Sequence, residues 1–249
     1  MKHIQTGLIF ALLLSFSLAG CVSEDAGNDG LDLQVDYDLL NGTIVETYND
    51  GELVSLDSVT IEFDFSKTTS DNKLSIFGID TNDSRNPIEI NANETSIVSV
   101  DFVEHGLYEL TLYAIDSDNN QANLSLTVRI DLTIDWTESF TDEPQILTFD
   151  PRPTNGGQHP VMIEIESTVE NPELITELGN GESVDITWNI VDEYDDTCQR
   201  NGAQIANGDQ GTWNTIHFNT YLVHELIVEF DEDQDTISIH HWISIIYDE

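Results

Sequence analysis

From Leu33 onward, apolar and polar residues alternate along the chain, and this pattern constrains the fold more than any other feature. The alternating runs are short and are bounded by clusters of Gly, Asn, Asp or Ser; a clear early run is Val59, Ile61, Phe63 and Phe65. A period of two predicts half-buried β-strands, whereas an amphipathic helix has a period of 3.6. The nearest helical candidate, residues 172–178, covers only a turn or two and begins with Pro172. We therefore predict an all-β fold.

The segment 98–130 predicts a strand, a turn and a hairpin. Its first strand begins at Val100 and Phe102 and turns at His105-Gly106. The two hairpin strands alternate in the same way, with apolar residues at Tyr108, Leu110, Leu112 and Ala114 and then at Leu124, Leu126 and Val128.

The residues of this segment resemble the second half of a PKD (polycystic-kidney-disease) repeat. The similarity lies in V-D-F-V-E-H-G-L-Y-E-L-T-L-Y-A-I-D-S-D-N-N from residue 100, in L-S-L-T-V at 124–128, and in the early strand V-T-I-E-F-D-F-S-K-T at 59–68. It covers residues 33–131 and departs at 76–80, where the family has a W-D-F-G-D-G-type strand. The resemblance implies an immunoglobulin-like β-sandwich of a kind common on prokaryotic and archaeal surfaces.

A second, diverged copy emerges when the chain is shifted by 116 residues. Val100, Phe102, Glu109, Leu110 and Leu112 then fall on Ile216, Phe218, Glu225, Leu226 and Val228. The segment 186–190 looks like the missing tryptophan strand, and we expect its Trp188 to lie in the core. These observations predict two tandem PKD-like sandwiches, at residues 33–131 and 132–249.

No Gly/Pro linker separates the two predicted domains. Strict alternation runs from Leu124 to Trp136, thirteen residues, or about 43 Å at strand rise. The last strand of one domain is therefore expected to continue into the first strand of the next, giving a stiff end-to-end pair.

The first 21 residues have the pattern of an export signal. Lys2 precedes an apolar run from Leu8 to Leu18, too short to span a bilayer. The sequence Leu18-Ala19-Gly20-Cys21 resembles the lipobox of prokaryotic lipoproteins, which implies that residues 1–20 are removed and that Cys21 carries lipid. Residues 21–32 would be a flexible spacer, and the protein would be extracytoplasmic and anchored to the membrane. The alternative is an ordinary secretory signal with an incidental cysteine.

Charge is the extreme feature of the composition. The chain has 48 Asp and Glu against 7 Lys and Arg, a net charge of −41, yet 39% of its residues are hydrophobic, enough for packed cores. Such a chain repels nucleic acid, and its self-repulsion falls in brine, where the Debye length is only a few ångströms. We expect a salt-adapted protein that is more stable at high salt.

Two acidic turns offer oxygen ligands for calcium. They contain Asp116 and Asp118, and Asp231, Asp233 and Asp235. Ca²⁺ prefers such ligands, but Asp and Asn also favour turns for backbone reasons. Neither segment matches an EF-hand. Turn chemistry is the favoured interpretation, weak Ca²⁺ binding is the alternative, and no other cofactor is expected.

Four histidines lie near the C-terminus: His217, His224, His240 and His241. Pairing Val228 with Ile237 and Leu226 with Ile239 would place His224 opposite His241. With Cys198, which has no disulfide partner if Cys21 is lipidated, this pair is a candidate zinc site. A buried, hydrogen-bonded histidine pair is the favoured alternative.

The sequence carries no catalytic motif: no G-x-S-x-G, H-E-x-x-H, P-loop or G-x-G-x-x-G is found. We therefore predict a binding, adhesion or spacer module at the cell surface, with a protein or glycan as ligand, and not an enzyme. The alternative is an accessory or substrate-binding subunit of a surface hydrolase or transporter. Exposed aromatic residues near the loop 155–159, expected to project from the second domain, would favour ligand binding. Sequons at Asn41, Asn82, Asn93 and Asn123 are candidate glycosylation sites.

Overall fold

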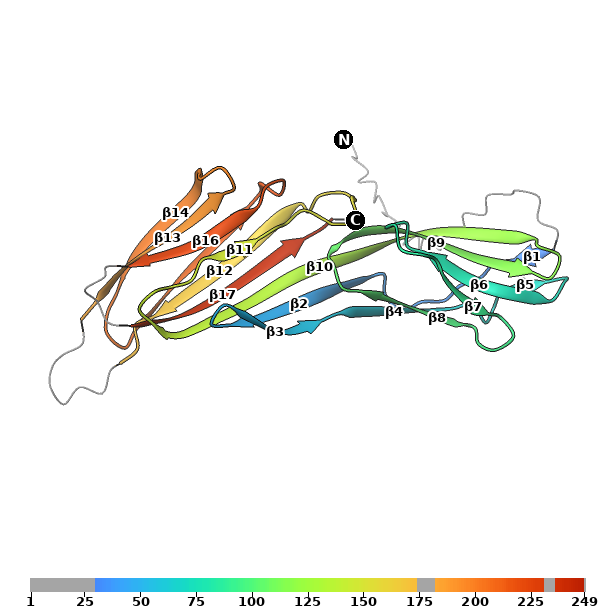
Figure 1. Cartoon of the computed structure of the whole chain (residues 1–249), viewed down its shortest axis with the longest axis horizontal. Helices are drawn as coiled ribbons and strands as arrows, with labels where there is room; N and C mark the ends of the chain where they lie inside the picture. Colours follow the sequence, from blue (N-terminus) through green and yellow to red (C-terminus); the bar gives the residue numbers. More distant parts are fainter. Residues whose placement is uncertain (1–29, 174–181, 231–235, 249) are drawn as a thin grey trace, which may run out of the picture.

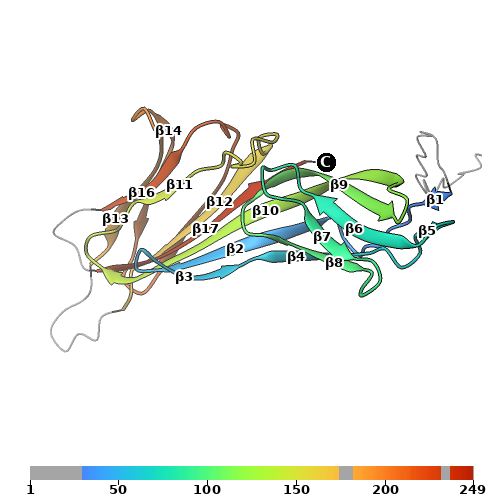
Figure 2. The same ribbon diagram turned by 45° about the vertical axis from the view of Figure 1, so that its right-hand side comes forward.

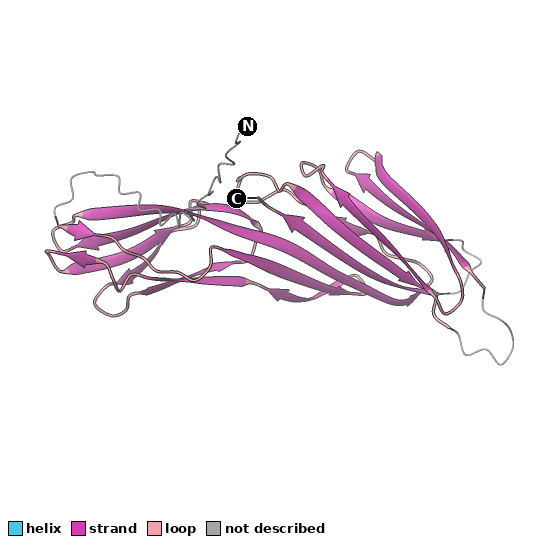
Figure 3. Cartoon of the chain, turned by 180° about the vertical axis from the view of Figure 1, so that it is seen from behind, coloured by secondary structure: helices cyan, strands magenta, loops and turns pink. Residues whose placement is uncertain are grey.

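The computed structural model describes residues 30–173, 182–230 and 236–248, and these form seventeen β-strands and no helix. The strands build an elongated molecule of two β-sandwich halves placed end to end (Figures 1 and 3). The all-β prediction is therefore confirmed. The predicted signal peptide, Cys21 and most of the predicted spacer lie outside the described residues. Within the described ranges, no helix is long and apolar enough to cross a membrane.

One strand runs through both halves. β10 (Gln121–Thr141) has 21 residues, and the uninterrupted strand expected from the alternation is confirmed. Along one edge it pairs antiparallel first with β9 (Gly106–Asp116) and then with β17 (Ile237–Ile246). Along the other edge it pairs in parallel with β2 (Asn41–Asn49). The boundary expected between residues 131 and 132 therefore lies inside a strand.

The first half packs two layers face to face (Figure 2). One layer continues from β9 to β6 (Leu74–Asp80) and β7 (Ile88–Asn91). The other contains the pair of β4 (Val59–Asp64) and β8 (Ile97–Phe102), with a short pair of β1 (Leu31–Asp32) and β5 (Thr69–Ser70) near the N-terminus. Alternate residues point inward, so that Phe65 stacks on Phe77 with ring centroids 4.9 Å apart.

The second half has the same two-layer plan. One layer runs β15 (Gln210–His217), β12 (Met162–Glu170), β17 and β10, and β2 with β3 (Glu52–Asp57) extends it. The facing layer runs β11 (Leu147–Phe149), β16 (His224–Phe230), β13 (Val184–Asp192) and β14 (Thr197–Ile205). Trp188 is completely buried between the layers, which confirms its expected core position.

The predicted pairing of residues 226–228 with residues 237–239, as a hairpin at the C-terminal end, is wrong. β16 pairs with β11 and β13, whereas β17 pairs with β10 and β12, so the two strands lie in different layers. Val228 does not pair with Ile237, nor Leu226 with Ile239. Both strands alternate, and an inward-facing apolar row fits a crossover between layers as well as it fits a hairpin.

The alignment of the two predicted copies, which are offset by 116 residues, is also out of register in its first part. Val100 and Phe102 are buried, but Ile216 and Phe218 face solvent with exposed fractions of 45% and 69%. The inward position at this point of β15 belongs to His217. A slip of one residue exchanges the two faces of a strand.

Candidate ligand-binding face

The outward face of β15, β12, β17 and β10 presents an aromatic ring between carboxylates. Strand register places Trp242 of β17 beside Glu166 of β12 and beside Asp135 of β10. Asn214 of β15 follows Glu166 in the same row. Side chains at paired positions on one face are direct neighbours, so this row is continuous across four strands.

A second row of paired residues lies on the same face, two positions further along each strand. Ile216, Glu164 and Ser244 are paired across β15, β12 and β17. The two rows line a depression of about 430 Å³, formed by Glu164, Ile165, Glu166, Asn214, Thr215, Ile216, Trp242 and Ser244. Trp242 is 42% exposed, although it is the largest side chain in the depression.

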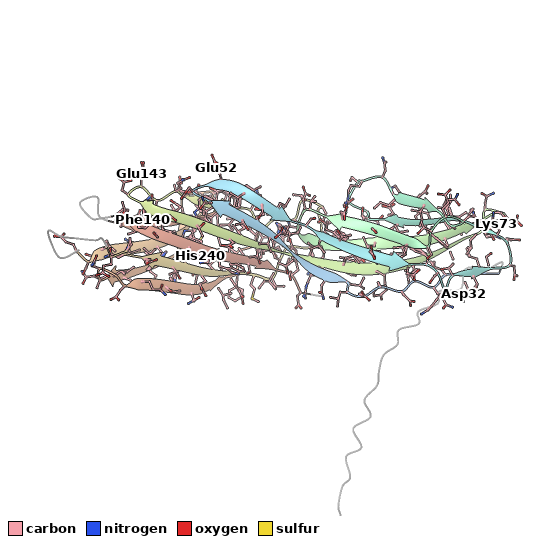
Figure 4. All side chains as sticks on the ribbon, turned by 90° about the horizontal axis from the view of Figure 1, so that it is seen from below. Asp32, Glu52, Lys73, Phe140, Glu143 and His240 are labelled. Atoms are coloured by element: carbon pink, nitrogen blue, oxygen red, sulfur yellow. The ribbon has the colours of Figure 1, made fainter. Side chains whose placement is uncertain are left out.

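His240, which is labelled in Figure 4, supports one side of this face. Its Nε2 atom donates to Asp135 Oδ1 over 2.8 Å. Its ring stands perpendicular to the Trp242 ring, with centroids 6.5 Å apart. The indole and the Asp135 carboxylate are thus held by one common neighbour, which lowers the entropy lost when a ligand orders them.

This arrangement can bind a neutral, hydroxyl-rich ligand. An aromatic face accepts the slightly positive C–H face of a sugar ring, and ionised carboxylates accept hydrogen bonds from its hydroxyl groups. Three carboxylates, of Asp135, Glu164 and Glu166, border the indole on this face. They repel anionic ligands, including acidic glycans.

The acidic turn at Asp116, the first candidate calcium site, is a closed hydrogen-bond network. Oδ1 accepts the backbone N–H groups of Asp118 and Asn120. Oδ2 accepts from the side chains of Ser70, Asn72 and Asn120. These donors lower the pKa of Asp116 to about 2, although burial opposes them. Because both oxygens already have protein donors, the geometry supports the turn interpretation. Asp231, Asp233 and Asp235 lie outside the described residues.

The predicted pair of His224 and His241 is not formed. His241 lies opposite Ser167 and Trp136, where its Nδ1 atom is 2.8 Å from Ser167 Oγ. Trp188 Nε1 donates to the same Ser167 oxygen over 2.7 Å. Burial lowers the pKa of His241 to about 3, so its ring is neutral. His224 packs instead against His217, with ring centroids 4.6 Å apart.

The loop expected to project from the second half packs against the first half. Asn155 Nδ2 donates to the backbone oxygen of Leu107 over 2.8 Å. Next to it, His159 packs on Tyr221, a strongly exposed ring. Of the sequon residues, Asn82, Asn93 and Asn123 are exposed and Asn41 is half-buried. The Asn82 amide nitrogen donates to the backbone of Glu109.

Comparison with known proteins assigns no family. No family model and no curated protein matches the chain, so the PKD resemblance stays a prediction. Among solved structures, similarity is found to a carbohydrate-binding module of the β-sandwich superfamily, at 8% identity and a TM-score of 0.32, covering 87% of this chain and 99% of that one. Fibronectin(III)-like modules of Clostridium thermocellum CbhA match at 12% identity and a TM-score of 0.26, covering 70% and 94%. Bacteroides ovatus SGBP-B, solved with a mixed-linkage heptasaccharide, matches at 10% identity and a TM-score of 0.21, covering 79% and 51%. These TM-scores are too low to support a fold assignment. The β-sandwich architecture is therefore inferred from the strand pairing of this chain.

Proposed function

We propose that this protein is a lipid-anchored surface module that binds a neutral glycan on the outward face of its second half. The observation that carries the proposal is the Trp242 row, in which an exposed indole stands between Glu166 and Asp135. Exposed apolar surface rimmed by hydrogen-bonding groups is typical of binding sites.

The shape of the molecule would place this face in the half that points away from the membrane. Asp32 lies at one end of the elongated body, and Phe140 and Glu143 lie at the other (Figure 4). A lipid on Cys21 would therefore hold the first half toward the membrane. β10 joins the halves without a hinge, so the second half would stand away from the bilayer.

Glycan binding is tested with the full chain on an array of neutral and acidic glycans, followed by calorimetry in molar NaCl. Trp242→Ala should weaken binding of the best neutral ligand by roughly 10-fold or more, as for a central aromatic contact. Tyr194→Ala is the matched control, because this exposed ring lies in the β13–β14 turn, outside the face. Equal affinity of the Trp242→Ala variant and the unmodified chain, or binding confined to acidic glycans, would refute the proposal.

A further inference from the structure

Two members of the candidate zinc site expected from the sequence meet a different histidine at one end of the second half, since His217 takes the place expected for His241. The three side chains are Cys198 at the start of β14, His217 at the end of β15 and His224 at the start of β16. One ligand atom from each lies within 4.8 Å of those from the other two. The surrounding loops are tied by a hydrogen bond from Glu193 N to Val223 O of 3.0 Å.

Both histidines carry a buried nitrogen that lacks a protein partner. His217 is 6% exposed and His224 is 0% exposed. Within the described part of the chain, His217 Nε2 and His224 Nδ1 have no hydrogen-bond partner. Buried polar atoms are rarely left unpaired, and such an exception requires an explanation.

The contacts of His224 prepare it as a ligand. Its Nε2 atom lies 2.8 Å from the backbone oxygen of Asn219. A carbonyl can only accept, so Nε2 carries the proton and Nδ1 keeps a free lone pair. Metal-binding histidines in proteins are oriented in the same way, by donating the other ring N–H to a carbonyl or carboxylate.

His217 makes one long contact through its other nitrogen. Gln199 Nε2 lies 3.4 Å from His217 Nδ1 and donates to the backbone oxygen of Ile216. Ligation through Nε2 uses the neutral tautomer that carries its proton on Nδ1. That tautomer gives up the long contact, while Gln199 keeps its hydrogen bonds to Ile216 and Thr215.

A β-bulge places Cys198 at the site. Gln199 pairs with Ile190 and Thr197 pairs with Val191, so Cys198 is the extra residue of β14. Bulges redirect a side chain in this way and are frequent at functional sites. The Cys198 sulfur lies 3.9 Å from Oδ2 of Asp192, whose Oδ1 accepts the backbone N–H groups of Tyr194 and Asp196.

We propose that Cys198, His217 and His224 bind one divalent ion of the zinc class, with the Asp192 carboxylate as a fourth ligand. Thiolate and imidazole are the usual ligands of Zn²⁺, whereas Ca²⁺ takes oxygen ligands only. In a tetrahedral zinc site the ligand atoms are about 3.3–3.6 Å apart. The group therefore has to close by about 1 Å, through rotation of the exposed Cys198 side chain and small shifts of the two imidazole rings.

The charges of the group match a divalent cation. Binding replaces the S–H bond of Cys198 by an S–metal bond and releases one proton. The thiolate and the Asp192 carboxylate then together balance the two charges of the ion.

The test uses the full chain in molar NaCl with excess Ca²⁺, which occupies non-specific acidic sites. Calorimetric titration with Zn²⁺ should show one ion bound per chain with release of a proton. Co²⁺ should give the visible absorption of a tetrahedral site and a thiolate-to-cobalt charge-transfer band in the near ultraviolet.

Cys198→Ser should abolish that band and weaken Zn²⁺ binding by roughly 100-fold, because it removes a direct ligand. This exposed position tolerates the change without loss of the fold. Cys21→Ser is the matched control and should retain both signals. Zn²⁺ binding that is equal in the Cys198→Ser variant, or a charge-transfer band that is lost with Cys21, would overturn the proposal.

Discussion

Acid should destabilise this protein through His241, and the size of the effect follows from its burial. The ring is neutral in the folded protein because burial lowers its pKa from 6.5 to about 3. In the unfolded chain it protonates near pH 6.5, so unfolding takes up a proton between these two values. The contribution of the neutral ring to stability is complete above pH 6.5 and is lost progressively as the pH falls toward 3.

The expected loss between pH 7.5 and pH 4.5 is roughly 2–3 kcal/mol, at about 1.4 kcal/mol for each pH unit below 6.5. His241→Gln keeps an acceptor for Ser167 but does not titrate. Urea unfolding of both proteins at each pH, in molar NaCl, isolates this contribution because the other titrating groups cancel in the difference. The variant should therefore lose 2–3 kcal/mol less than the unmodified chain over this range.

Ser167→Ala separates titration from packing. It removes the acceptor of Trp188 Nε1 and should cost about 1–3 kcal/mol at every pH. His241 stays buried in this variant, so the additional acid loss should remain. If His241→Gln and the unmodified chain lose equal stability between pH 7.5 and pH 4.5, the claim that the buried His241 ring is neutral in the folded protein is refuted.

Three further predictions concern salt, packing and anchoring. The thermal midpoint should rise from low to molar NaCl because salt screens a net charge of −41, and an unchanged midpoint would contradict this. Gly78→Ala should destabilise the first half by about 1–3 kcal/mol in urea unfolding, because the new Cβ would lie 2.2 Å from the Tyr113 ring; equal stability would show that the ring shifts freely. Cys21→Ser should move the protein from the membrane fraction to the medium in its native cells, and unmodified protein found in the medium without lipid would argue against the anchor.

Local features of the fold could be predicted from the sequence because they leave a local pattern. Alternation identifies most strands, and its persistence from Leu124 to Trp136 predicts the continuous β10. The turn at Asp116 follows from its Asp and Asn residues.

Pairing between distant strands could not be predicted, because it leaves no local signal. The parallel pairing of β2 with β10 joins residues about ninety positions apart, such as Tyr48 and Trp136. The crossover from β16 to β17 separates His224 from His241. His217 is named by the sequence but not placed at the site, because the repeat alignment puts its neighbour Ile216 inward. The alternation of β15 itself, with Trp213, Thr215 and His217 on one face, indicates the correct register.

The continuity of β10 also determines how the molecule comes apart. Its buried side chains contribute to both halves, and one apolar cluster reaches from Phe63 in β4 to Ile243 in β17. Neither half can lose its central strand without exposing the core of the other. The two halves should therefore denature together, in one cooperative transition whose calorimetric and van't Hoff enthalpies agree.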